Sequence, residues 1–141
     1  MKVLLIISAV TWELPQTLLA LILIIFYKGI KEIHFYKSTW FVKTKKSYNH
    51  KGARAVSLGR IILIDDALYN NVRWKKHEYG HTIQSLFLGW FYLIVVGFFS
   101  YGHNFIWRKA WQGKKLYWDM FPENWADDLG QVTEHEKQKG F

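Results

Sequence analysis

Apolar residues along this chain gather in two long blocks, and the residues between the blocks follow a different pattern. The first block, Val3 to Tyr27, contains a single formal charge, at Glu13. As a helix it would be about 37 Å long, enough to span a bilayer with some tilt. Against Lys2 before the block, six lysines follow it closely: Lys28, Lys31, Lys37, Lys43, Lys45 and Lys46. By the positive-inside rule, residues 1–30 are predicted to form a membrane anchor helix that leaves the rest of the chain on the cytoplasmic side.

A cleaved signal peptide is the alternative interpretation of this block. It fits less well, because the block is long and a basic segment follows it instead of a small-residue cleavage site. Glu13 and Pro15 interrupt the apolar run, and an ionisable group inside a membrane is costly and usually paired or functional. Glu13 either has such a role or faces the protein interior or a membrane boundary, with Pro15 kinking the helix. The second alternative is favoured.

Between the blocks, residues Glu32 to Ile64 are rich in β-branched and aromatic side chains with polar residues interspersed, a pattern typical of strands. We expect a β-hairpin with its turn near Gly52 and with Gly59 as a candidate bulge. A helix is then predicted from about Asn71 to Leu88. These elements indicate an α+β domain over residues 31–141.

The second apolar block, Leu86 to Tyr101, has only 16 residues and includes two glycines. This length is short for a membrane-spanning helix. A short helix is expected further on, opening at Pro122 and ending near Gly130, because proline favours the first helical position and glycine the C-terminal cap.

Composition limits the classes of protein to consider. The 141 residues are 50% hydrophobic and 18% aromatic, so the chain has room for about one domain that can bury a core or face lipid. A net charge of +8 would suit a nucleic-acid binder or a protein on anionic lipid. Because the apolar residues fall in long blocks, a lipid bilayer is the expected partner and nucleic acid is not. The absence of cysteine excludes disulfides and cysteine-based zinc sites.

The predicted helix over residues 71–88 carries the sequence His77-Glu78-Tyr79-Gly80-His81, an H-E-x-x-H motif. Residues four apart share one helix face, so both imidazoles can reach one ion. Glu78 points elsewhere and can touch a water on the metal as a general base.

A catalytic zinc site needs three protein ligands and one open position. Glu123 and Asp127 lie four apart on the predicted short helix, so both carboxylates lie on one face. Glu123 would complete a His₂Glu ligand set, and Asp127 could hold the second nitrogen of a ligand histidine. This site requires the block from Leu86 to Tyr101 to be a re-entrant or core helix that returns the chain to the same face, since a full crossing would separate His81 from Glu123.

The segments "HEYGH" and "ENWAD" together resemble the motifs of the gluzincin metallopeptidases, in particular the membrane branch that includes the CAAX prenyl proteases and heat-shock membrane metalloproteases. The resemblance covers about residues 54–130 and implies a minimal zincin-like metallopeptidase domain. It implies that the zinc ligands are His77, His81 and Glu123, that Glu78 is the catalytic base, and that Asp127 supports a ligand. It further implies that the strand around residues 55–64 pairs with an extended peptide substrate.

The expected function is that of a membrane-anchored zinc metalloendopeptidase acting on a peptide or membrane-protein substrate. Zn²⁺ would polarise the carbonyl, and Glu78 would take a proton from water and pass it to the leaving amine. For the group that stabilises the oxyanion, the candidates are Tyr101, His103 and Tyr117. Two alternatives remain open. One is a non-catalytic zinc-binding membrane protein that acts through partner binding, and the other is a basic membrane-surface or nucleic-acid binder in which the motif arose by chance.

Overall fold

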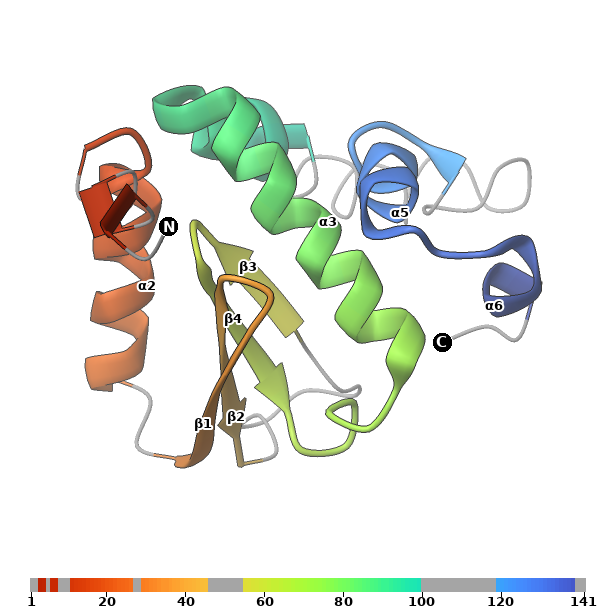
Figure 1. Ribbon diagram of the computed structural model, residues 1–141, viewed down its shortest axis with the longest axis horizontal. Coiled ribbons are helices and arrows are strands. Elements are labelled where there is room, and N and C mark those ends of the chain that lie inside the picture. Colours follow the sequence, from red (N-terminus) through yellow and green to blue (C-terminus); the bar gives the residue numbers. More distant parts are fainter. Residues whose placement is uncertain are drawn as a thin grey trace.

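A four-stranded mixed sheet forms the centre of the fold in this computed structural model (Figure 1). Its strands are β1 (Ile30–Tyr36), β2 (Thr39–Thr44), β3 (Ala55–Leu58) and β4 (Ile61–Asp65). The strand order is β1-β2-β4-β3, with β2 and β4 parallel in the middle and an antiparallel partner on each side. Every residue of β4 is buried, which agrees with its uninterrupted apolar sequence "IILI" and its central place.

The prediction of one β-hairpin over residues 32–64 is wrong, because each of its two expected strands folds into a hairpin of its own. The first turns at Lys37 and Ser38, which both have positive φ angles, 46° and 66°. Tight two-residue turns require such angles and usually contain asparagine or glycine. The sequence Lys37-Ser38 therefore did not indicate a turn. The second turns at Gly59, with φ of 61°, which makes this glycine a turn residue and not a bulge.

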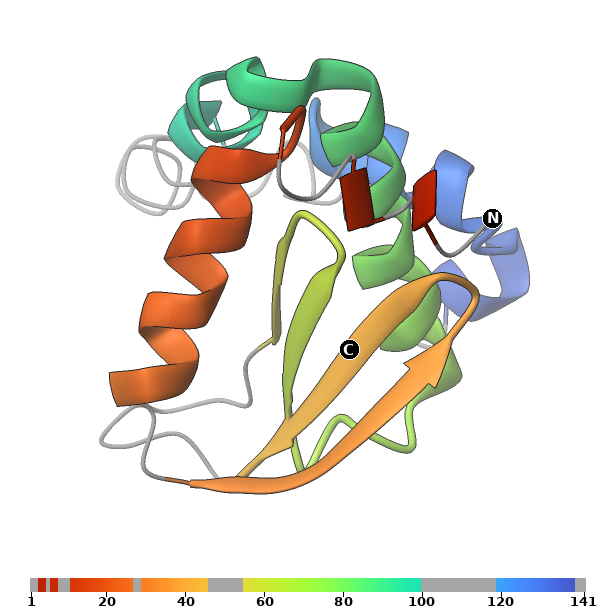
Figure 2. The same ribbon diagram turned by 60° about the vertical axis from the view of Figure 1, so that its left-hand side comes forward.

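The helix that carries the H-E-x-x-H motif is α3 (Val72–Leu88), close to its predicted bounds. Asn71 caps its start: the side-chain oxygen accepts hydrogen bonds from the backbone N–H groups of Arg73 at 3.0 Å and Trp74 at 3.3 Å. A second helix, α2 (Leu14–Phe26), stands on the opposite side of the β3–β4 hairpin from α3, as two views show (Figures 1 and 2).

The prediction of a membrane helix over Val3 to Tyr27 is wrong, and so is the membrane localisation with a cytoplasmic catalytic part that depended on it. Within the part of the chain that the structure describes, no helix combines the length and the apolar character needed to cross a bilayer. A turn at residues 11–13 interrupts the apolar run. The helix after it, α2, has 13 residues, and at 1.5 Å per residue its length is about 20 Å.

The physical reason lies at Glu13, which is fully buried inside the protein. Its Oε2 accepts a hydrogen bond from Arg60 Nε at 3.1 Å, and its Oε1 accepts one from Ser85 Oγ at 2.8 Å. Gln16, one turn further, donates to Ser85 Oγ at 3.0 Å and to the carbonyl of Gly89 at 2.8 Å. These contacts join the start of α2 to the sheet and to α3. The charge that interrupts the apolar block is therefore part of the protein interior.

The second apolar block also contributes to the core. It continues α3 into a 3-10 turn, η1 (Gly89–Phe91), and a π-helical turn, η2 (Leu93–Gly97). The buried residues of this core cluster come from α2, the sheet and this block: Ala20, Val42, Leu58, Ile61, Leu63, Tyr92 and Val96. Among the described residues, two short helices follow: α5 (Glu123–Gly130) and α6 (Glu134–Gln138).

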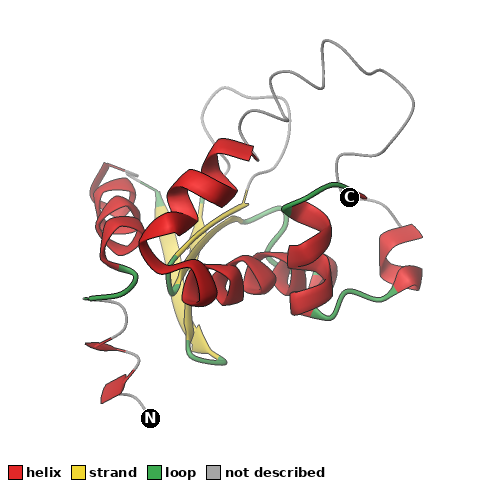
Figure 3. Cartoon of the chain, turned by 90° about the horizontal axis from the view of Figure 1, so that it is seen from above, coloured by secondary structure: helices red, strands yellow, loops and turns green. Residues whose placement is uncertain are grey.

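The structure describes residues 3–4, 6–7, 11–26, 29–45, 55–99 and 119–138 (Figure 3). The expected turn residue Gly52 lies outside these ranges. The three candidates for an oxyanion-stabilising group, Tyr101, His103 and Tyr117, also lie outside them.

Candidate metal centre

Close packing of α3 against α5 brings the two predicted motifs together. Gly80 and Gly130 lie where the helices touch, and a Cβ atom added at Gly130 would lie 2.0 Å from the carbonyl oxygen of Lys76. Only glycine allows this approach of backbone to backbone. Gly80 occupies the second x position of the H-E-x-x-H motif. Its small size allows α5 to come within reach of the two histidines.

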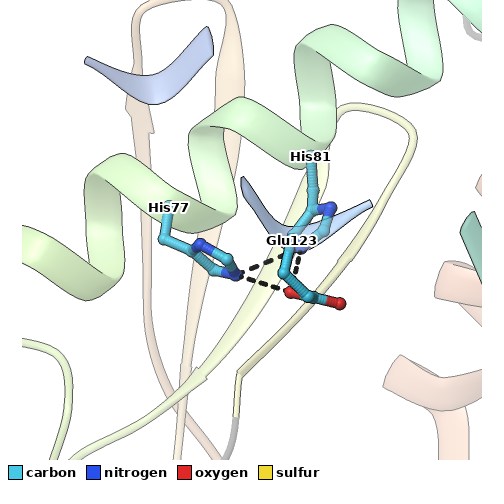
Figure 4. A group of neighbouring side chains, drawn as sticks. All are labelled: His77, His81 and Glu123. Carbon is cyan, nitrogen blue, oxygen red and sulfur yellow. Dashed lines mark hydrogen bonds and ion pairs between the residues drawn. The ribbon is translucent and has the colours of Figure 1, made fainter. Parts of the chain in front are cut away.

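The three predicted ligands converge on one point between these helices (Figure 4). His77 Nε2 lies 3.2 Å from His81 Nε2 and 3.1 Å from Glu123 Oε2. His81 Nε2 lies 3.3 Å from the same carboxylate oxygen. All three side chains are buried, and His81 is the most exposed of them, with 8% of its surface accessible.

The remaining nitrogen of each imidazole has a fixed partner. His77 Nδ1 lies 2.7 Å from Asp127 Oδ1, and His81 Nδ1 lies 2.8 Å from Gln84 Oε1. The Gln84 amide is itself oriented, because its Nε2 donates to the carbonyl of Pro122 at 2.8 Å. Both partner atoms are acceptors, so each Nδ1 carries the proton and donates it. Each Nε2 then presents a lone pair, the form in which histidine binds metals.

The spacing of the three atoms fits a metal ion. Ligands at about 2.0–2.1 Å from a tetrahedral ion are about 3.3–3.4 Å apart. The observed separations of 3.1, 3.2 and 3.3 Å among His77, His81 and Glu123 are close to one face of such a tetrahedron. Two lone pairs and a carboxylate at this distance repel each other unless a cation lies between them. The group could therefore hold a metal ion with a fourth position left for another ligand.

The electrostatics of the protein alone also favour a positive charge here. Burial by itself lowers the pKa of His77, but the hydrogen bonds with Asp127 and Glu123 outweigh it and raise this pKa to about 9. Burial would raise the pKa of Glu123, but the hydrogen bonds with His77 and His81 outweigh it and hold this pKa well below its usual range. A proton held between these groups occupies the place that a metal cation would take.

Glu78 is buried beside the ligands, and its negative charge contributes to the raised pKa of His77. Ser57 Oγ lies 2.7 Å from Oε2 of Glu78 and 2.8 Å from the backbone carbonyl oxygen of Glu78, so its hydroxyl has two acceptors on this one residue. Ser57 lies on β3, an outer strand of the sheet. The backbone carbonyl of Ser57 accepts a hydrogen bond from the Tyr92 hydroxyl at 2.9 Å, so the second apolar block is joined to β3 at this residue. β3 and the motif helix thus meet at Glu78.

Sequence reasoning missed two residues of the site. Gln84 follows His81 by three positions on the same helix face, so its spacing was a usable signal. Ser57 lies 21 residues before Glu78, and no local pattern connects the two.

Comparison with protein-family models, with curated proteins and with solved structures found no match to this chain. The chemistry of the centre is therefore inferred from its own residues and from the resemblance of its two motifs.

Proposed function

We propose that this chain is a zinc-dependent metallopeptidase that hydrolyses peptide bonds, with Glu78 as the general base. One observation carries the proposal: His77, His81 and Glu123 present three ligand atoms 3.1–3.3 Å apart beside a buried glutamate. The H-E-x-x-H spacing on a helix and a distant glutamate ligand agree with this chemistry.

The ligand chemistry supports zinc as the metal. Two imidazole nitrogens and one carboxylate oxygen form a His₂Glu set, which is one of the ligand sets of catalytic zinc. Hard cations such as Mg²⁺ and Ca²⁺ prefer oxygen ligands alone. Three protein ligands leave one coordination position open, as a catalytic site requires and a structural site does not.

When bound, zinc supplies Lewis acidity that polarises a peptide carbonyl and lowers the pKa of a water toward about 7. The residues of the chain perform the other steps. Ser57 Oγ holds Oε2 of Glu78, so Oε1 is the oxygen left to accept a proton from the attacking water. Glu78 then passes this proton to the leaving amine. Asp127 and Gln84 keep the two imidazoles in one tautomer and one orientation during the reaction.

We further propose that the peptide substrate pairs with the outer edge of β3. This strand pairs with β4 on one side, and among the described strands none pairs with its other side. An extended peptide can add to such an edge through backbone hydrogen bonds. Because Ser57 of β3 touches Glu78, a peptide at this edge would run beside the general base.

The experiment is peptide cleavage by purified protein, with zinc content measured on the same samples. Glu78→Gln should keep wild-type zinc and lose at least about 100-fold in turnover of quenched-fluorescence peptides. Glu134→Gln, whose side chain is 82% exposed, is the matched control and should behave as wild type. Stoichiometric zinc in a wild-type protein that cleaves no peptide, or equal cleavage by Glu78→Gln, would contradict the proposal. The former result would favour a non-catalytic zinc-binding protein that acts through partner binding.

A further inference from the structure

A pocket separate from the metal centre lies where α3 faces the β1–β2 hairpin. Its volume is about 390 Å³, within the usual range for small-molecule sites. From α3 it is lined by Val72, Lys75, Lys76 and Tyr79, which are spaced along one helix face. The metal ligands His77 and His81 do not line it.

The charge of this pocket is positive. Its lining includes Lys37, Lys75 and Lys76 and no aspartate or glutamate. Lys76 is neutralised by Glu136, with Nζ 2.8 Å from Oε1. All 11 Asp and Glu residues of the sequence lie in the part of the chain that the structure describes, and none of them pairs with Lys37 or Lys75. Two ammonium groups are thus left at the pocket without a side-chain counter-ion.

Aromatic rings hold these two ammonium groups in place. Lys75 Nζ lies 3.9 Å from the ring centre of Tyr69. Lys37 Nζ lies 5.6 Å from the ring centre of Tyr36 and 5.7 Å from that of Tyr79. These are cation–π distances, so the rings and the charges belong to one arrangement. The three tyrosines also give the pocket flat apolar walls on which a ring can stack.

We propose that this pocket binds a small molecule in which an anionic group is attached to an aromatic ring, either a nucleoside phosphate or an aromatic carboxylate. The anion pairs with Lys37 and Lys75, and the ring packs against the tyrosines. None of the residues His77, His81 and Glu123 lines this pocket. We therefore expect binding here to be independent of a metal at the other site.

The first test is calorimetric titration with four compounds: AMP, benzoate, adenosine and inorganic phosphate. We expect AMP or benzoate to bind one molecule per chain, and the tighter of the two identifies the ligand class. Adenosine lacks the anion and phosphate lacks the ring, so both should bind at least about tenfold more weakly than the better ligand. Absence of AMP and benzoate binding at millimolar concentration would overturn the proposal. Phosphate binding as tight as that of AMP and benzoate would also overturn it.

The second test uses three single variants. Lys37→Gln and Lys75→Gln should each weaken binding of the better ligand by about tenfold. Lys137→Gln removes the same charge from a lysine that pairs with Glu134 and does not line the pocket, and it should bind as wild type. Equal binding by all three variants would overturn the proposal. Titration of wild-type protein with the better ligand should give the same affinity before and after the protein's zinc is removed, so this result does not depend on the proposed peptidase activity.

Discussion

Gly80 lies against the backbone carbonyl of Ala126 so closely that a Cβ atom added at Gly80 would be 1.9 Å from the carbonyl oxygen. This contact sets the separation of α3 and α5. Since the histidines lie on α3 and Glu123 on α5, the same contact sets the distance between the candidate metal ligands.

Gly80→Ala should therefore push α5 away and abolish stoichiometric metal binding. The obstructing atom belongs to backbone and cannot rotate away, so the free energy of unfolding should fall by about 3 kcal/mol, the upper end for overpacking. Gly97→Ala is the matched control, because an added Cβ at Gly97 meets no atom within 4 Å. Metal content and urea denaturation measure both effects. Wild-type metal content in Gly80→Ala would show that this contact does not set the ligand distance.

Asp127→Asn should weaken metal binding by about 10–100-fold, because it removes the charge that supports His77 through Nδ1. The neighbouring Asp128 is exposed, so Asp128→Asn is a matched control and should leave the affinity unchanged. Competition with a chromophoric chelator gives both affinities. Equal metal affinities for the two variants would show that Asp127 does not support metal binding.

Ser57→Ala should lower the kcat of peptide cleavage by about 10–100-fold, since a hydrogen bond to a charged group contributes about 1.5–3 kcal/mol. The substitution removes the donor that holds the Glu78 carboxylate and touches no metal ligand. Zinc content and KM should therefore stay at their wild-type values. A loss of zinc together with activity would mean that Ser57 maintains the fold and does not position Glu78.

Glu13→Gln should destabilise the protein by about 3–5 kcal/mol, because it leaves Arg60 beside a neutral group in the interior. Glu134→Gln breaks an ion pair whose carboxylate is exposed, and should change stability by less than about 0.5 kcal/mol. Urea denaturation of both variants measures the difference. Equal stabilities would mean that the contacts of Glu13 contribute little to holding α2 on the core.

Local spacing predicted the parts of the site that lie on single helices. Residues four apart on a helix must share a face, so the sequence alone pairs His77 with His81, and Glu123 with Asp127. The helix predicted from about Asn71 to Leu88 is also confirmed, with α3 running from Val72 to Leu88. The contact between the two helices was inferred only from the resemblance and from the ligand count.

Features that depend on tertiary contacts could not be predicted this way. An apolar block has the same sequence signature whether it faces lipid or packs on a sheet. The buried ion pair of Glu13 with Arg60 shows that the first block packs on the protein, and this pair is visible only in the folded structure. Two tight turns divide the expected hairpin into two hairpins. The turn at Lys37 and Ser38 lacks the usual turn residues, and strand pairing is set by contacts between segments, so the sequence did not indicate this division. The link between Ser57 and Glu78 joins a strand to a helix and has no fixed spacing.

The most direct measurement is X-ray absorption at the zinc edge on protein loaded with one equivalent of zinc. We expect two imidazole nitrogens and oxygen ligands at about 2.0–2.2 Å, with four-coordinate geometry. That result is the ligand set expected for zinc held by His77, His81 and Glu123. Failure to retain one zinc per chain, or a spectrum with only oxygen ligands in six-coordinate geometry, would contradict a metal centre at these residues.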